Sequence, residues 1–349
     1  QLLVANPIQQ QQQLLSRISV LCRNAAQVEA VLEGGEAAVD EVVIDFLEAR
    51  GVEEALKRVR SHGLRAVVAA PRVIKPEEKN LVHWLLGLKP DAILVRSTGL
   101  LEQLNLLYEA HKTTDPLPQL HGDFSLNAAN EVTVWTLLES SRLDRLTPCH
   151  DLDAAQLATL QENLEESSSY LKPKLECVIH QHLPIFHTEH CVFCKFLSNG
   201  SSYKDCGHPC ESKTVHLRDT ASGHDHLVLA DMGCRNTVFN SQAQSAAPYL
   251  HRLSQSGYRR FRIELVDEPS PFVGPLVAKY ADVLSMMEGG GGSREKKSTS
   301  SDIRDAERGL MSWLEIVPDA NGRTHGVTEG SLRPSDERNW ASLRPTARR

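Results

Sequence analysis

The sequence predicts an α/β protein folded as a (β/α)8 barrel of the TIM type, with a cysteine-rich insertion between strands seven and eight. Apolar, strand-like segments alternate with helix-like segments along residues 16–284. Eight such units in a segment of about 250 residues or slightly more is the usual size of this barrel. A doubly wound open sheet has a similar alternation and is the alternative.

Eight short runs rich in Val, Ile and Leu predict the strands, because these side chains pack well on a pleated surface. In chain order they are RISVLCR (17–23), EVVIDF (41–46), RAVVAA (65–70), AILVRS (92–97), LPQLHGDFSLN (117–127), LDRLTPCHDL (143–152), LECVIHQHL (175–183) and FRIELVDE (261–268). Helical periodicity predicts helices between them, among others at 51–63, 76–88, 131–141, 154–166 and 246–257.

The alternation stops between the seventh and eighth strands. Residues 184–240 contain a cysteine-rich stretch followed by a predicted hairpin over 213–219 and 224–233. In a barrel this insertion lies at the C-terminal face, where active sites are built.

Three segments outside the barrel differ from it in composition. Residues 1–15 hold a glutamine run and are expected to be disordered. Residues 285–308 are rich in Gly, Ser and charge and predict a linker. Residues 309–349 predict a tail that docks on the barrel and is disordered at its end. Because the first residue is Gln1 and not Met, we expect a processed protein or a piece of a longer one.

Composition and charge exclude several classes of protein. The chain has 349 residues, of which 41% are hydrophobic, and this is enough for a sizeable core. A net charge of -7 argues against a tight, autonomous RNA binder. The basic runs at 57–60 and 258–262 are interpreted as a solvated helix face and a strand edge. No apolar run approaches the roughly 18 residues that a membrane span requires.

Eight cysteines, five of them in one segment, favour metal or redox chemistry over a disulfide scaffold. The protein is therefore expected in a reducing compartment, the cytoplasm or an organelle interior, and is not expected to be secreted. The five are Cys191, Cys194, Cys206, Cys210 and Cys234. Clustered thiolates repel one another unless a cation holds them, so zinc and an iron–sulfur cluster are both candidates. Only the spacing of Cys191 and Cys194 fits a zinc knuckle.

The other cysteines and the histidines also have a purely structural interpretation. Cys22, Cys149 and Cys177 lie in apolar strand patterns and are interpreted as packed, inert thiols. Histidines could bind zinc, act as acid and base or be structural; the candidates are His180, His182, His187, His190 and His208.

Polar side chains at the ends of the predicted strands are candidates for binding and catalysis, because that end of a barrel carries the active site. They are Asp45, Arg72, Arg96, Asp123, Asn127, His150, Asp151 and Glu264. Arg72 and Arg96 are expected to bind an anionic group through two parallel hydrogen bonds. The alternative is an ordinary ion pair with Asp45, Asp123 or Glu264. Asn127 could orient a substrate or cap the next helix. The catalytic candidates are Arg72, Arg96, Asn127, His150, His180 and Glu264.

Several motifs occur in a recognisable order. They are AAPRVIKP, ILVRSTGLL, GDFSLNAAN, LTPCHDL, LECVIHQHLPIFHTEHCVFCKFLSNG, DCGHPCE, GCRNTVFN and HGVTEGSL. In these motifs the chain resembles the collagenase-like peptidase family U32, in the branch with an extra collagenase-associated domain of unknown function. The resemblance spans residues 16–332.

The resemblance implies a (β/α)8 barrel that binds a 4Fe-4S cluster through four cysteines. Here these correspond to Cys191, Cys206, Cys210 and Cys234, with Cys194 in reserve. The family signature has a further cysteine where this chain has Pro184, so the usual ligand set is altered. Better understood members assist oxygen-independent hydroxylation, either of RNA pyrimidines with prephenate as oxygen source or of the ubiquinone ring. Collagenase activity attributed to a few members gave the family its name.

Three functions are therefore open. The first is an iron–sulfur barrel that assists hydroxylation of an RNA pyrimidine or a quinone-type ring, with prephenate or another small carboxylated substrate, RNA and a partner subunit as candidate partners. The second is a thiol peptidase, which clustered cysteines and histidines fit loosely; no Gly-x-Ser-x-Gly or His-Glu-x-x-His motif is present. The third is a metal-stapled, non-catalytic domain of a larger protein, with zinc as the alternative cofactor.

Overall fold

The computed structural model describes residues 16–335 apart from 36–37, 48, 76–77, 111–115, 168–173, 232 and 289–297. The glutamine-rich segment 1–15 and the end of the tail, 336–349, lie outside the described residues, as do the predictions made for them.

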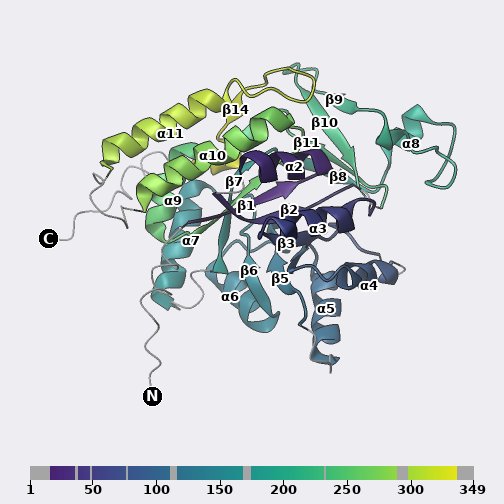
Figure 1. Ribbon diagram of the computed structural model, residues 1–349, viewed down its shortest axis with the longest axis horizontal. Coiled ribbons are helices and arrows are strands. Elements are labelled where there is room, and N and C mark those ends of the chain that lie inside the picture. The colour runs from purple at the N-terminus through teal and green to yellow at the C-terminus, as the bar shows by residue number, and fades with distance from the viewer. Residues whose placement is uncertain are drawn as a thin grey trace.

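Eight parallel strands form one curled sheet (Figure 1). Their order is β7-β13-β1-β2-β3-β4-β5-β6, and a parallel bridge joins Leu146 at the end of β6 to Leu175 before β7. The bounds are β1 (Arg17–Cys22), β2 (Val39–Ile44), β3 (Arg65–Ala69), β4 (Ala92–Val95), β5 (Gln119–Gly122), β6 (Leu143–Leu146), β7 (Glu176–Gln181) and β13 (Arg260–Glu264). All eight predicted strands are present. The order does not reverse within the sheet, so the fold is TIM-barrel-like and the doubly wound alternative is wrong.

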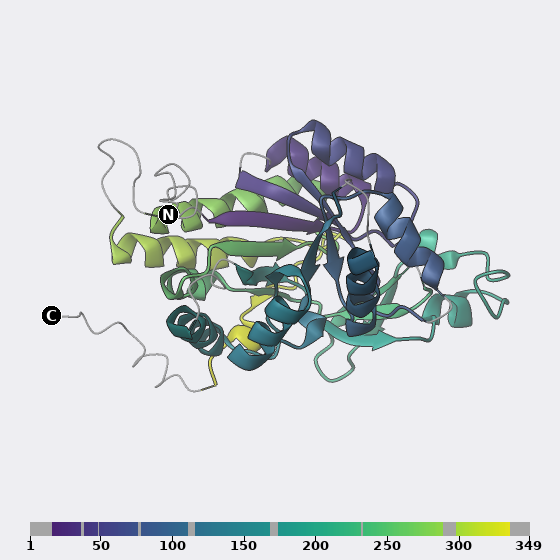
Figure 2. The same cartoon turned by 90° about the horizontal axis from the view of Figure 1, so that it is seen from below.

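Helices cover the outer face of this sheet (Figure 2). They are α2 (Ala25–Gly34), α3 (Val52–Ser61), α4 (Lys79–Gly87), α5 (Thr98–Ala110), α6 (Glu131–Ser140), α7 (Ala154–Ser167), α9 (Leu250–Ser256), α10 (Ser270–Met287) and α11 (Ser300–Leu314). The sequence of α3 is typical: Val52, Ala55, Leu56 and Val59 are buried, and this spacing places them on one face.

The predicted linker over 285–308 is wrong at both ends, because α10 continues to Met287 and α11 begins at Ser300. A capping box starts this helix: the Thr299 hydroxyl accepts from the backbone N–H of Asp302, and the Asp302 carboxylate accepts from that of Thr299. Leu310 and Leu314 then pack into the core. The tail continues into β14 (Val327–Thr328), which pairs with β12 (Ala243–Ser245). The predicted docking of the tail is present as far as the chain is described.

The segment between β7 and β12 leaves the barrel and forms a second, four-stranded antiparallel sheet, which we call the cap sheet. It consists of β8 (Pro184–Thr188), β9 (Val215–Arg218), β10 (Asp225–Ala230) and β11 (Asn236–Phe239), with the short helix α8 (Val192–Leu197). The predicted hairpin is β9 and β10. Figure 1 shows the cap sheet at the upper right, with α8 beyond it.

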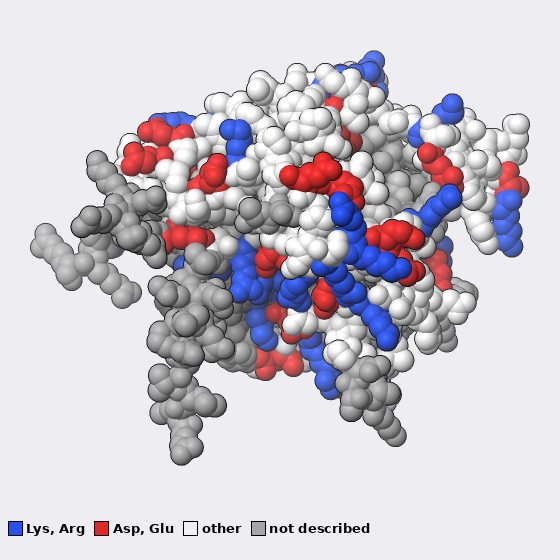
Figure 3. Space-filling view, viewed as in Figure 1, with Lys and Arg blue, Asp and Glu red and all other residues white. Residues whose placement is uncertain are grey.

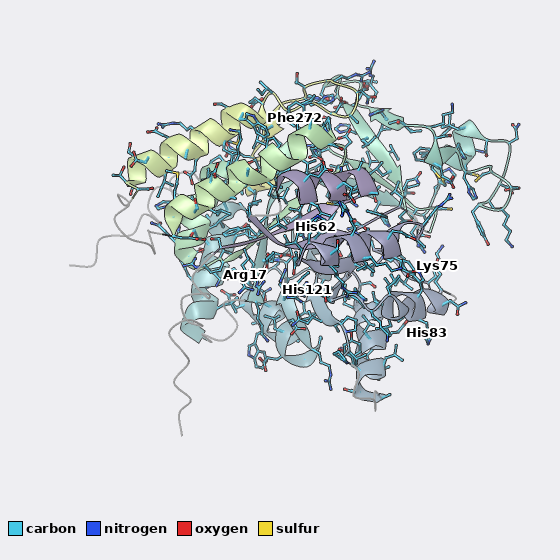
Figure 4. All side chains as sticks on the ribbon, in the orientation of Figure 1. Arg17, His62, Lys75, His83, His121 and Phe272 are labelled. Atoms are coloured by element: carbon cyan, nitrogen blue, oxygen red, sulfur yellow. The ribbon has the colours of Figure 1, made fainter. Side chains whose placement is uncertain are left out.

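The inside of the curled sheet is apolar on one side and charged on the other. Leu21, Val43, Val67 and Leu94 of β1 to β4 form a small apolar cluster with two alanines. Facing side chains of β5, β6, β7 and β13 are polar and buried, including His121, which is labelled in Figure 4. Among the described helices, none is both long and apolar enough to cross a lipid bilayer.

Candidate functional site

A cleft of about 730 Å³, counted with its open mouth, lies between the C-terminal ends of the barrel strands and the cap sheet. Its polar lining is Arg23, Asp45, Arg72, Arg96, His187, Asp231, Thr237 and Glu264, and its apolar lining is Phe46, Leu47, Pro71, Phe124, Pro184, Leu229, Ala230 and Phe239. Three of the predicted catalytic candidates, Arg72, Arg96 and Glu264, are therefore in one place.

The two arginines singled out from the sequence have different surroundings. Arg96 donates two hydrogen bonds to Asp45, at 2.9 and 2.8 Å, and a third to Asp123 at 2.9 Å. Asp45 also pairs with Arg23 at 2.5 Å. Arg72 forms no ion pair within the described part of the chain, and its guanidinium carbon lies 5.2 Å from the centroid of the Phe124 ring. Arg96 is thus held as an ion pair, whereas Arg72 is free to bind an anion.

Phe124 links the cleft to the predicted candidate His150. The two rings are stacked, with centroids 3.8 Å apart and 11° between their planes. Burial lowers the pKa of His150 to about 3, so the imidazole is neutral. Neither ring nitrogen has a hydrogen-bond partner in the described part of the chain. His150 supports the aromatic floor of the cleft from below and does not line it.

Three groups of the cleft could exchange protons. Burial raises the pKa of Glu264 and that of Asp231. Burial lowers the pKa of His187, whose Nδ1 bonds the Thr237 hydroxyl at 2.9 Å. Its Nε2 has no partner among the described residues. A neutral imidazole with an unused nitrogen can take or give a proton at that atom.

A buried ionic network lies beneath the cleft. Arg262 is completely buried and reaches Asp123 at 2.5 Å, Glu176 at 2.9 Å and Glu264 at 2.8 Å. Arg145 in turn bonds Glu176 at 2.7 Å and also contacts Glu41. Pairing and hydrogen bonds are what allow such charges to be buried. This network fixes the carboxylates at the base of the cleft.

Cys191 and Cys210 lie on the other side of the cap sheet from the barrel. Residues alternate between the two faces along β10 and β11. Cys191 and Cys210 pack against a cluster that includes Val228 and Phe193. On the barrel side, Leu227 packs with other residues against Val266. One sheet therefore separates these two cysteines from the cleft.

The turn after β10 joins the two sides. Asp231 lines the cleft, and its carboxylate accepts hydrogen bonds from the backbone N–H groups of Gly233, at 2.9 Å, and Arg235, at 3.0 Å. Cys234 lies within this turn in the left-handed conformation, with φ 58°. Cys234 therefore lies three residues along the chain from Asp231, whose side chain lines the cleft.

The thiols influence one another electrostatically. Burial raises the pKa of Cys210, and the neighbouring Cys191 and Cys234 raise it further. Burial also raises the pKa of Cys234, with contributions from Cys191, Cys206 and Cys194. All five side chains are half-buried and free of disulfides. Such mutual effects require the five sulfurs to be near one another.

A buried arginine ties the cap sheet to the barrel. Arg235 is 1% exposed; it bonds Glu189 at 2.8 Å and Glu78, just before α4, at 3.2 Å. Lys75, labelled in Figure 4, also reaches Glu189 at 2.6 Å. These ion pairs hold the cap sheet over the cleft.

Other sequence candidates lie elsewhere. Asn127 is exposed and ends the short helix η2 (Phe124–Leu126), and Asn130, not Asn127, caps α6. Asp151 is exposed outside the cleft. His180 is buried in a separate cavity, where it contacts Glu268 and Tyr280. Neither Asn127 nor Asp151 nor His180 therefore belongs to the cleft.

The basic runs are paired with acids. Lys57 bonds Glu53 and Arg58 bonds Glu29, and Figure 3 shows blue and red side chains interleaved over this part of the surface. In the second run, Arg262 is buried inside the sheet. The interpretation of the second run as a solvated strand edge is wrong for Arg262, because β13 lies between β7 and β1 and this side chain points into the buried ionic network.

Among the cleft residues that the sequence does not single out for this site are Arg23, Phe124, His187 and Asp231. Arg23 and Phe124 lie near the ends of predicted strands, as Arg96 does, so these positions could have identified them. His187 and Asp231 come from the cap sheet, and no local pattern places that sheet over the barrel.

Comparison with known families decides the affiliation. Residues 24–312 match the model of Peptidase family U32. The chain belongs to this family. The match does not include the extra collagenase-associated domain, which stays a prediction. No curated protein matches this U32 member.

Solved structures with a similar fold include aldolases. The YdjI aldolase from Escherichia coli is 8% identical with a TM-score of 0.41, and the match covers 90% of the U32 chain and 96% of the aldolase. The HpcH/HpaI aldolase from Desulfitobacterium hafniense is 9% identical with a TM-score of 0.37, over 82% and 98% of the two chains. Likeness at this level does not extend to function, because one fold supports many activities.

Proposed function

We propose that this U32 protein holds an iron–sulfur cluster on its cap sheet and assists oxygen-independent hydroxylation of a small, carboxylated or quinone-type ring bound in the cleft. The observation that carries the proposal is the position of Arg72, the unpaired cation of an aromatic cleft, one sheet away from Cys191 and Cys210 of the cysteine cluster.

The cysteine sulfurs do not form a compact tetrahedral zinc site within the described part of the chain. A tetrahedral zinc ion with Zn–S bonds of about 2.3 Å brings its sulfurs to within about 3.8 Å of one another. In the described part of the chain, no three cysteine sulfurs lie within 4.8 Å of one another. A four-iron cube spaces its cysteine ligands more widely. Cys191, Cys206, Cys210 and Cys234 would hold it, with Cys194 in reserve. When bound, such a cluster would supply one-electron transfer, which the two-electron conversion of C–H to C–OH can use.

The cleft supports a ring-shaped anion as the ligand. The Arg72 guanidinium can grip a carboxylate with two hydrogen bonds. Phe46, Phe124 and Phe239 offer aromatic surface to a ring and exclude water from it. His187 can hold or release a proton at Nε2, the atom without a partner among the described residues.

A small ring compound fits these observations better than an RNA base does. Binding of RNA draws most of its affinity from cations that contact phosphates. The basic runs considered from the sequence are paired with carboxylates or buried. For a small carboxylated molecule such as prephenate, Arg72 offers a cation to one carboxylate.

The two alternative functions have less support. A thiol peptidase needs a thiolate activated by a histidine and a lowered pKa. Burial instead raises the pKa of Cys210 and of Cys234, and no hydrogen bond between a cysteine and a histidine is present in the described residues. A purely structural, metal-stapled domain does not need the charged, aromatic cleft that this chain has.

The first test is purification without oxygen followed by iron and acid-labile sulfide analysis. About four irons and four sulfides per chain are expected. Titration of the same protein with prephenate should give saturable binding, which Arg72→Ala weakens by about tenfold or more. The matched control is Arg218→Ala, because Arg218 is exposed on β9 and pairs with Asp225. Absence of iron after reconstitution, or equal binding by the two variants, would overturn the proposal.

A further inference from the structure

We infer that His182, Asp267, Glu268 and Ser241 form a binding site for a divalent transition-metal cation, separate from the cysteines and from the cleft. The site takes a metal of the zinc class with nitrogen and oxygen ligands. This inference does not rest on the proposed function.

The fold brings the three charged or imidazole side chains together. His182 follows β7, and Asp267 and Glu268 follow β13, the parallel neighbour of β7. The C-terminal ends of parallel neighbours meet at one edge of the sheet. One donor atom from each of the three residues lies within 4.8 Å of the other two.

The distance between two of these donors has the right magnitude. His182 Nε2 and Glu268 Oε1 are 3.3 Å apart. Two ligands that bind a tetrahedral zinc ion at about 2.0–2.1 Å are themselves about 3.3 Å apart. Little movement of these side chains would be needed to accept the ion.

The tautomer of His182 favours a metal ligand. Its Nδ1 lies 2.8 Å from the backbone carbonyl of Asn240, which can only accept a hydrogen bond, so Nδ1 carries the proton. Nε2 is then the atom that faces Glu268, to which it donates a hydrogen bond in the absence of a metal, and a bound cation would take the place of this proton. A backbone carbonyl that fixes the imidazole in this way is a usual outer partner of a metal-bound histidine.

The charge of the surrounding cavity calls for a cation. This cavity, of about 380 Å³, is lined by three carboxylates: Asp267, Glu268 and Asp319. Among the described residues of its lining, the side chains that can carry positive charge are the histidines His180, His182 and His325. His180 Nε2 lies 3.2 Å from Glu268, and His325 Nε2 lies 3.1 Å from Asp319.

Ser241 supplies an independent indication. It lines the same cavity and is 6% exposed. Its hydroxyl oxygen is buried and has no hydrogen-bond partner among the described residues. Buried hydroxyls are normally paired, so an unpaired one beside two carboxylates and an imidazole points to a ligand at this position.

The site would connect the barrel to the tail. The cavity is closed by Leu314, Val317 and Pro318 together with Gly326, all from the segment that follows or ends α11. A metal ion held by the strand ends would therefore lie under this segment. Binding to the folded state alone raises its stability, so the cation should raise the unfolding temperature.

Cobalt(II) provides the test, because its spectrum reports the ligands. The full chain is first reconstituted with iron and sulfide, and Co²⁺ is then titrated in. One Co²⁺ per chain with weak visible bands and no thiolate charge-transfer band is expected, together with a higher unfolding temperature. Asp267→Asn and His182→Ala should weaken this binding by about tenfold or more. His325→Ala is the matched control, since His325 lines the same cavity outside the donor set.

The alternative is that a protonated His182 fills the role of the cation as an ion pair with Glu268. In that case the wild-type chain binds Co²⁺ only with a thiolate spectrum or not at all, and the inference is overturned. Equal Co²⁺ affinity of Asp267→Asn and the wild type would overturn it as well. Asp267→Asn replaces one carboxylate oxygen with an amide nitrogen. This variant therefore still tests the metal site if His182→Ala fails to fold.

Discussion

The guanidinium carbon of Arg72 lies 5.2 Å from the centroid of the Phe124 ring, and this arginine has no carboxylate partner among the described residues. Arg96, one strand further round the sheet, is bound by two carboxylates at 2.8 to 2.9 Å. Both arginines follow a parallel strand and both face the cleft. Their different pairing assigns ligand binding to Arg72 and support of the site to Arg96.

The two arginines should therefore differ in their effect on stability. Arg96→Ala leaves Asp45 with Arg23 and Asp123 with Arg262 as the remaining cations, and the loss of the buried pairs should lower the free energy of unfolding by about 3–5 kcal/mol. Arg72→Ala removes a half-buried side chain with no ion pair and should change it by less than about 1 kcal/mol. Urea unfolding of both variants measures this contrast, and equal losses would contradict the assignment.

Arg262→Met tests the buried network. Although burial raises the pKa of Asp123, Arg262 and Arg96 hold it below its usual range. The variant leaves Asp123, Glu176 and Glu264 short of a cation and should lose about 3–5 kcal/mol at neutral pH. Because these carboxylates can then escape the cost by protonation, the loss should shrink as the pH falls toward 5. Denaturant unfolding at both pH values checks this, and a loss independent of pH would point to packing alone.

The cysteine assignment predicts a contrast between two thiols. Cys210→Ala should abolish bound iron, because Cys210 lies with the other cysteines beside the cap sheet. Cys22→Ala should leave iron unchanged, since Cys22 is fully buried in β1 and burial raises the pKa of its thiol. Iron analysis of anaerobically purified variants gives the answer. Equal iron content in the two would refute the ligand set.

Gly200 should be required for the position of Cys206. A Cβ added at Gly200 would lie 2.6 Å from the carbonyl group of Asp205 and from the Cα of Cys206. These are backbone atoms, so Gly200→Ala must displace the loop and should lower the iron content and the unfolding temperature. In contrast, Gly309 is in the middle of α11 with nothing within 4 Å of an added Cβ. Gly309→Ala should stabilise the chain by about 0.5–1 kcal/mol. Equal changes in iron content and unfolding temperature for the two variants would show that the close contact at Gly200 does not fix the position of Cys206.

Glu307 should make stability depend on pH. Burial raises the pKa of this carboxyl to about 7, and it accepts a hydrogen bond from the backbone N–H of His251 at 2.8 Å. The folded state thus favours the protonated acid, so its contribution is complete below the unfolded pKa of about 4.3 and is lost as the pH rises through about 7. At pH 8, Glu307→Gln should be about 1–3 kcal/mol more stable than the wild type, and at pH 4.5 the gain should vanish. Thermal unfolding across this range measures the difference, and a constant offset would exclude the titration.

Local patterns in the sequence were sufficient for the elements of the barrel. The eight strands were predicted because short runs of Val, Ile and Leu recur between helical periods, and each run is found in the sheet. The linker prediction is wrong at 300–308, where it rests on the local content of Ser and charged residues. Those residues form the start of α11, because Thr299 and Asp302 cap it and its apolar stripe packs on the core. A helix with mixed composition depends on packing that composition does not reveal.

The sequence by itself determined the α/β class, the alternation of strands and helices, the cysteine-rich segment and the affiliation with family U32. Only the tertiary structure decided that Arg96 is neutralised by Asp45 and Asp123 while Arg72 is free, and that His182 meets Asp267 and Glu268. It also put Cys191 and Cys210 on the opposite side of the cap sheet from the cleft. The physical reason is that periodicity reports on neighbours within one element, whereas these contacts join strand ends and loops that are far apart in the chain and meet only when the sheet curls.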